Sequence, residues 1–179
     1  FNSLYGSTLV ECKALLPDNE TCFRLPGTDG KNKMSKSLGN CIYLSDSEEE
    51  LREKVRSMYT DPDHIKVSDP GKVEGNVVFT YLDAFADSES FKKYCNDYES
   101  LDELKKAYQK GGVGDMYIKK ILFNILNEFL TPIRARREEY KKDMDNVMEI
   151  LKKGTEEARE VAKENLAKFK NALRIDYFD

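Results

Sequence analysis

The chain has 179 residues and a formal net charge of −4. This length allows one ordinary domain or parts of two, with a core that needs neither a disulfide nor a metal to hold it. The acidic balance excludes a uniformly basic nucleic-acid-binding protein, so any site for a polyanion must be a local basic patch.

Residues 1–44 differ in pattern from the rest of the chain. Their short apolar segments are interrupted by Pro17, Pro26 and Gly27. Residues 22–25 have the composition of a strand, and residues 41–44 lead out of a basic loop. This pattern is typical of the edge of an α/β domain.

From Ser45 onward the pattern becomes helical. Ser47 and Glu50 fit a capping box at the start of a helix that should end before Asp61-Pro62. Residues 61–76 should form a long loop. The segment VVFTYLDAFA that follows suits either a strand or a helix, and its spacing favours a helix. SLDELKKAYQKGG has a serine cap and a glycine stop, which predict another helix.

The strongest periodicity comes next and predicts one long helix. A wide apolar stripe includes Ile118, Ile121, Leu122, Ile125, Leu126, Phe129, Leu130 and Ile133. We expect Pro132 to kink this helix without ending it. The stripe resumes at Tyr140, Met144, Val147, Met148 and Leu151. A last helix from about Thr155 should bury Val161, Leu166, Phe169 and Leu173, so residues 45–179 are predicted to form an all-helical bundle.

The remaining residue types exclude several kinds of site. The only histidine, His64, falls in a predicted loop, where we expect no catalytic role, and Phe79, Tyr81 and Phe85 should be core rather than a base-stacking platform. No apolar run approaches the roughly 20 residues that cross a bilayer, and FNSLYGSTLV lacks the features of a signal peptide. The cysteines are spaced too widely for a zinc site, so we expect reduced, mostly buried thiols, no metal site and a cytoplasmic protein. They are Cys12, Cys22, Cys41 and Cys95.

The segment KNKMSKSLGN has the composition of a mobile basic loop. Lys33 and Lys36 supply point charges, and Ser35 and Ser37 supply hydroxyl donors. The flanking glycines allow the loop to close over a substrate and open again. These groups suit a triphosphate whose departing end must be stabilised. Neither G-x-x-x-x-G-K-[ST] nor G-x-G-x-x-G occurs, and the plain alternative is a solvated lysine-rich turn.

The longer stretch GTDGKNKMSKSLGN resembles the second signature of class I aminoacyl-tRNA synthetases, and most closely that of the tryptophanyl and tyrosyl enzymes. SMYTDPDHIKV, GNVVFTYLDAF and the helical tail resemble the bacterial tryptophanyl-tRNA synthetases. The H-x-G-H signature near the start of that family has no counterpart here. The resemblance therefore covers the carboxyl-terminal half of the family, and because the chain starts without methionine we expect it to be a piece of a longer protein.

The resemblance implies a fold and two functional parts. The chain should be mainly α-helical. Residues 1–44 would be the C-terminal edge of a Rossmann-like α/β catalytic domain carrying the KMSKS loop. Residues 45–179 would be an all-helical domain that binds the tRNA anticodon.

The resemblance also implies an activity for the full-length protein. It would activate tryptophan with ATP and Mg²⁺ to the aminoacyl-adenylate and transfer it to tRNA(Trp). Lys33 and Lys36 would be catalytic. The ATP-binding set would be Arg24, Lys33, Met34, Ser35, Lys36 and Ser37, with no metal ligand from the chain.

Most of the tryptophan pocket would lie upstream in this family, so we expect the chain alone to be inactive. The full-length protein should be a homodimer without membrane attachment. Two alternatives stay open at this point: a tyrosyl-tRNA synthetase fragment, and a non-catalytic helical RNA-binding or scaffold module.

Basic residues outnumber acidic ones by seven to three between positions 116 and 142. Such a patch could contact RNA phosphates, or it could be the charged exterior of a helix. The resemblance favours tRNA. The candidate contacts are Lys119, Lys120, Arg134, Arg136 and Arg137.

Overall fold

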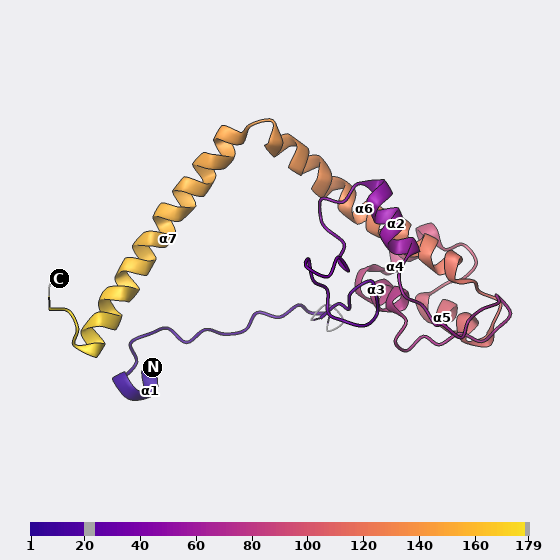
Figure 1. The fold of residues 1–179 in the computed structure, drawn as a ribbon, viewed down its shortest axis with the longest axis horizontal. Helices are drawn as coiled ribbons and strands as arrows, with labels where there is room; N and C mark the ends of the chain where they lie inside the picture. The colour runs from indigo at the N-terminus through magenta and orange to yellow at the C-terminus, as the bar shows by residue number, and fades with distance from the viewer. Residues whose placement is uncertain (20–23, 178–179) are drawn as a thin grey trace. The chain divides into compact units, whose positions relative to one another are not determined.

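The computed structural model describes residues 1–19 and 24–177, and these are mainly helical, as predicted (Figure 1). The helices are α1 (Asn2–Tyr5), α2 (Glu48–Arg56), α3 (Val77–Phe85), α4 (Ser88–Tyr94), α5 (Leu101–Lys110), α6 (Asp115–Lys141) and α7 (Met144–Leu173). Contacts divide the chain into two compact units, residues 16–137 and residues 1–15 with 138–179. No described helix is both long enough and apolar enough to cross a membrane.

The predicted strand at residues 22–25 is not seen where it can be checked. Residues 22 and 23 lie outside the described residues, and Arg24 and Leu25 form no strand. The extended pairing in this region is a single isolated bridge between Pro26 and Lys33. A strand needs a neighbouring strand for its hydrogen bonds, and the described part of the chain supplies none.

Local capping explains where the helices of the 16–137 unit begin. Ser47 and Glu50 form the predicted capping box of α2, with each side chain bonded to the other residue's main-chain N–H. Asn76 caps α3 by accepting from the amide of Val78 at 3.1 Å. This cap and five buried side chains on α3 confirm the helix where the composition also suited a strand.

The middle of this unit contains one predicted and one unpredicted helix. Ser100 caps α5, and the chain leaves that helix through Gly111 at φ 87°, a left-handed conformation that favours glycine. Helix α4 was not predicted. It has 7 residues, about two turns, with a single buried apolar residue, Phe91, and its start is fixed by Asp87 and Ser90.

Helix α6 supplies the largest share of the core. Its predicted stripe is buried from Ile118 to Leu130, and Pro132 lies inside the helix as expected. Phe129 is the exception on the stripe, with half of its surface exposed. Phe79 and Tyr81 are buried against the same core, and Phe85 packs at its margin, which confirms them as core residues.

A polar cluster closes the start of α6. The Asp115 carboxylate accepts from Thr60 Oγ1 at 2.6 Å, His64 Nδ1 at 2.8 Å and the Tyr108 hydroxyl at 2.8 Å. Burial works to raise the pKa of Asp115, but the three hydrogen bonds outweigh it and lower the pKa. His64 is thus a buried loop residue whose ring joins its loop to α5 and α6.

The predicted burial after α6 was wrong. Helix α7 begins at Met144 instead of near Thr155, and it buries no residue. Met144, Met148, Val161 and Leu166 are all more than half exposed. Phe169 stacks on Phe1 at a ring distance of 4.6 Å, the clearest packing contact of this unit. The apolar period predicts the helix, but burial also needs a partner surface.

The cysteines follow their expected state only in part. Cys41 and Cys95 are buried free thiols, whereas Cys12 is exposed. Cys12 lies in an extended segment with no core beside it. Cys22 is outside the described residues.

Candidate functional site

The basic loop is built on two turns. The Gly27 amide donates to Asn32 O at 2.7 Å, which folds residues 27–32 back on themselves. Gly30 has φ 69°, and a Cβ there would meet the Tyr59 ring, so both the backbone and the space require glycine. Gly39 has φ 65° and ends the loop.

The buried side chain of Asn40 connects separate parts of this loop through hydrogen bonds. Its side chain is almost fully buried, at 3% exposure. Asn40 Oδ1 accepts from the Ser35 amide at 2.8 Å, and Nδ2 donates to Lys33 O at 3.3 Å and Asp29 Oδ1 at 3.1 Å. The Asn40 carbonyl accepts from the Thr28 amide at 2.9 Å. Sequence reasoning missed this residue, and its only signal was its place directly after Gly39.

The Asp29 carboxylate is the outer anchor of that arrangement. Besides Asn40, it accepts from the amides of Lys31 at 3.3 Å and Asn32 at 3.5 Å. Burial works to raise the pKa of Asp29, but the hydrogen bonds from Asn40, Lys31 and Asn32 outweigh it and lower the pKa. The carboxylate is therefore charged at neutral pH, and its Oδ1 accepts from Lys31, Asn32 and Asn40.

The loop presents its predicted cations to solvent. Lys33 and Lys36 are exposed, and neither forms an ion pair with any residue in the described ranges. Ser35 Oγ and Ser37 Oγ share a hydrogen bond at 2.9 Å. Two ammonium groups and two hydroxyls thus stand on one short loop, and in the described residues neither ammonium group is paired with a carboxylate.

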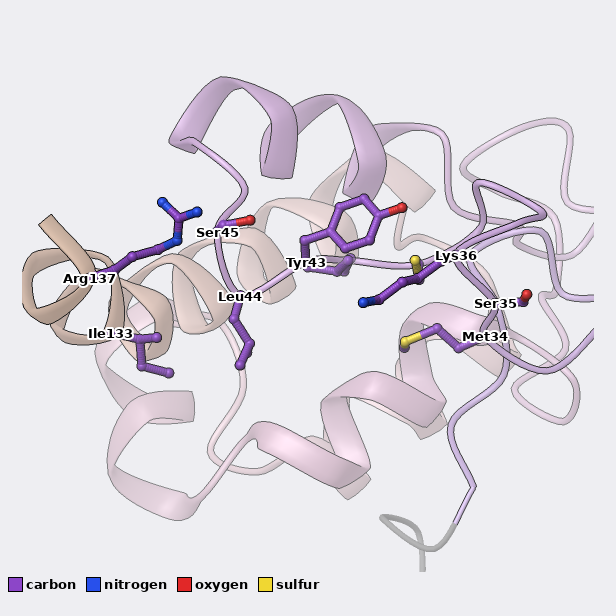
Figure 2. A pocket seen from close by; sticks show the side chains of 10 residues that line it. Met34, Ser35, Lys36, Tyr43, Leu44, Ser45, Ile133 and Arg137 are labelled. Carbon is purple, nitrogen blue, oxygen red and sulfur yellow. The ribbon is translucent and has the colours of Figure 1, made fainter. Parts of the chain in front are cut away.

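A cavity of about 710 Å³ lies between the loop and α6 (Figure 2). Met34, Ser35 and Lys36 line it from the loop, residues 41–45 form its side, and Ile133 and Arg137 line it from α6. Figure 2 shows Lys36 and Met34 toward one end and Arg137 toward the other. The structure therefore brings three of the predicted ATP-binding residues together, while Arg24, Lys33 and Ser37 do not line this cavity.

The predicted RNA-contact residues on α6 fall into two groups. Lys119 is buried and donates to Arg56 O at 2.9 Å, and burial lowers its pKa although Asp115 opposes this. Arg134 donates to Asp46 O at 3.1 Å and also to Asn127. These two side chains stabilise the fold. Lys120, Arg136 and Arg137 are exposed.

Lys120 belongs to a groove between α2 and α6 that the sequence did not predict. The groove has a volume of about 400 Å³, and Arg52, Arg56 and Lys120 line it together with Met116 and Phe123. The Arg52 guanidinium lies 4.1 Å from the Phe123 ring centre. None of its lining residues is acidic. In the described residues, no group of three or more His, Cys, Asp or Glu side chains could hold a metal ion.

Comparison with known families decides between the open alternatives. The model of the family described as tRNA synthetases class I (W and Y) matches residues 4–131. The chain belongs to this family. The resemblance of the KMSKS loop to class I synthetases is thereby confirmed.

Within the class I W and Y family, the similar relatives include tryptophan–tRNA ligases. That of Clostridium longisporum is 53% identical over 180 residues, which is all of this chain and 50% of the relative. That of Streptococcus mutans is 52% identical over 99% of this chain and 51% of the relative. The predicted resemblance to the tryptophanyl group, rather than the tyrosyl one, is confirmed. The chain spans about half the length of these relatives.

A solved structure supports the fold assignment. Tryptophanyl-tRNA synthetase from Campylobacter jejuni, in complex with ADP and tryptophan, is similar with a TM-score of 0.67 and 27% identity. The similarity covers 96% of this chain and 49% of that protein. The helical fold described above is therefore the fold of one half of a synthetase of this family.

Proposed function

We propose that this chain supplies the pyrophosphate-binding loop and the tRNA-binding helices of a tryptophan–tRNA ligase. The full-length protein would convert ATP and tryptophan to tryptophanyl-adenylate and pyrophosphate, and then transfer tryptophan to tRNA(Trp). The observation that carries the proposal is the cavity that Lys36 and Arg137 line from two elements, in a chain of this family.

The loop would act by charge stabilisation. As the bond between the α- and β-phosphates breaks, negative charge grows on the departing pyrophosphate. Lys33 and Lys36 are exposed and form no ion pair with the residues that the structure describes, so both are available for that charge. Mg²⁺ would arrive bound to the phosphates of ATP, with no ligand from this chain.

The neighbouring residues would complete the ATP site. Ser35 and Ser37 would donate hydroxyl hydrogen bonds to phosphate oxygens. Met34 lines the same cavity as Lys36 and would border the nucleotide. Arg24 precedes the loop and would border the adenine through its main chain.

The tRNA contacts follow from which cations are available. Lys119 and Arg134 are engaged inside the fold, so we assign phosphate contact on the basis of exposure alone, to Lys120, Arg136 and Arg137, and we add the exposed Arg56. The exposed Met116 side chain and the Arg52 guanidinium, which covers the buried Phe123 ring, would offer a stacking surface for single-stranded anticodon nucleotides. We further propose that the full-length enzyme is a cytoplasmic homodimer.

Exchange of pyrophosphate into ATP tests the loop directly. In a full-length synthetase that contains this chain, Lys36→Ala should slow tryptophan-dependent exchange by about 100-fold, because a transition-state cation is lost. Lys33→Ala should also slow the exchange, but by a smaller factor. Lys31→Ala is the matched control, since Lys31 is an exposed lysine of the same segment outside the KMSKS pentad. Equal exchange rates for all three variants and the parent enzyme would contradict the proposed role of the loop.

A further inference from the structure

We propose that Asn40 is a positioning residue for amino-acid activation: its buried side chain fixes the backbone of residues 33–35, so that Lys36 is held at the cavity. This inference rests on the proposed role of Lys36. It assigns to Asn40 no contact with ATP, only control of the loop that carries the contact.

The hydrogen bonds of Asn40 give it this control. Its amide oxygen accepts from the Ser35 N–H, and its amide nitrogen donates to the Lys33 carbonyl. The two bonds therefore fix main-chain groups on either side of Met34, directly before Lys36. The nature of the partners, one donor and two acceptors, also fixes which side-chain atom is oxygen and which is nitrogen.

A second anchor connects Asn40 to the turn at the start of the loop. Nδ2 also donates to Asp29 Oδ1, and Asp29 in turn accepts from two amides of residues 31 and 32. Gly27 packs directly on the Asn40 amide, because a Cβ at position 27 would collide with Asn40 Nδ2. Asn40 is thus enclosed by both arms of the loop and has little freedom to move.

These contacts explain why the residue is an asparagine. Aspartate has the same shape and could still accept from the Ser35 amide. It has no N–H, however, and would place a second carboxylate against Asp29 and the Lys33 carbonyl. Buried like-charged groups repel, and a buried acceptor without a donor is destabilised. Asn40→Asp should therefore release residues 33–35 while leaving the volume unchanged.

A released loop would slow the chemical step more than it weakens binding. Lys36 would remain present and charged but would have to be ordered during each turnover, and a small misplacement of a catalytic group already lowers the rate strongly. The KM for tryptophan should stay unchanged, because the family resemblance implies that most of the tryptophan pocket lies upstream of this chain.

The test is a double-mutant cycle in the full-length synthetase with ATP–pyrophosphate exchange as the readout. Asn40→Asp should lower kcat by about 10- to 100-fold with an unchanged KM for tryptophan. In the Lys36→Ala background, the same change should cost less than about threefold, because a residue that acts through Lys36 has nothing left to position. Far-UV circular dichroism checks that each variant is folded.

Two results would overturn the inference. One is an unchanged kcat for Asn40→Asp while Lys36→Ala remains slow. The other is a pair of effects that multiply independently, which is the behaviour of a residue with a structural role alone. If Asn40→Asp does not fold, Asp29→Ala takes its place, because it removes only the outer anchor at a half-buried position. Asp29→Ala must then lower kcat by about threefold to tenfold, and this loss must shrink in the Lys36→Ala background. If Lys36→Ala itself is fully active, the proposed function fails, and Asn40 has nothing to position.

Discussion

At the scale of single residues, the loop depends on one buried amide side chain, that of Asn40, and on the exposed ammonium groups of Lys33 and Lys36. Lys33, Ser35, Lys36 and Ser37 were predicted as a phosphate-binding set because their chemistry is visible in the sequence. Asn40 was missed, because an asparagine becomes a hub only when the fold brings Lys33 O, the Ser35 amide and Asp29 around it. Lys119 and Arg134 were predicted to contact RNA from their charge and the family resemblance, but each donates a hydrogen bond to a main-chain carbonyl within the fold.

The Asp115 cluster gives a pH prediction at this scale. In the folded chain, the pKa of the Asp115 carboxyl lies below its ordinary value of 3.8. The ionised Asp115 carboxylate therefore contributes to stability above the pKa of the unfolded state, and this contribution is lost as the pH falls through the pKa of the folded state. Asp115→Asn should lower the free energy of unfolding at pH 7 by about 1–3 kcal/mol, and this difference should shrink below about pH 3–4.

Urea unfolding of the chain, followed by near-UV circular dichroism of its buried tyrosines, measures this difference. The matched control is Asp63→Asn, whose carboxylate forms an exposed ion pair with Lys72. That change should cost less than about 0.5 kcal/mol. A difference between Asp115→Asn and the parent chain that stays the same at pH 7 and pH 3 would contradict the role given to the ionised carboxylate.

At the scale of elements, periodicity and caps predicted helices well and burial poorly. The capping box at Ser47 and the stripe of α6 both follow from local spacing, so they could be predicted from sequence. Helix α4 was missed because it is short and buries a single apolar residue. The exposure of α7 could not be predicted, since it depends on which surfaces lie beside the helix and not on the helix itself.

The groove between α2 and α6 gives a prediction for RNA binding. Lys120→Glu in the full-length synthetase should weaken tRNA(Trp) binding by about threefold to tenfold and reduce the salt dependence of binding by about one unit of slope. Its pyrophosphate exchange should stay unchanged, because Lys120 does not line the cavity beside the loop.

Lys106→Glu provides the comparison on another helix. Lys106 is an exposed lysine of α5 that does not line the groove, so its reversal changes the net charge equally. Filter binding at several salt concentrations separates a local contact from a general charge effect. Equal losses for the two variants would mean that the groove has no special role.

At the scale of the whole molecule, the mainly helical class was predicted and is confirmed. The boundary at residue 44 between a catalytic part and a helical part stays a prediction. In the structure, residues 24–44 lie in one compact unit with α2 to α5 and most of α6. The Tyr81 hydroxyl donates to Pro26 O at 2.8 Å, and the Tyr59 amide donates to Thr28 O at 2.9 Å. Contacts that join distant sequence positions of this kind have no local signal.

The packing of the loop on this helical unit has a functional consequence. The base of the loop is fixed to a buried core, while Lys33 and Lys36 stay exposed at its surface. A fixed base and free cations suit a loop that must receive a large anion and release it after the reaction. We therefore expect Lys36 to meet the departing phosphates of ATP.

The most direct test is a crystal structure of the full-length synthetase with Mg²⁺, a non-hydrolysable ATP analogue and tryptophan. We predict that Lys36 Nζ lies within hydrogen-bond distance, about 3 Å, of a β- or γ-phosphate oxygen, with the Asn40 bonds to Ser35 and Lys33 intact. A complex in which the nucleotide is fully bound and residues 33–37 lie away from its phosphates would contradict the account.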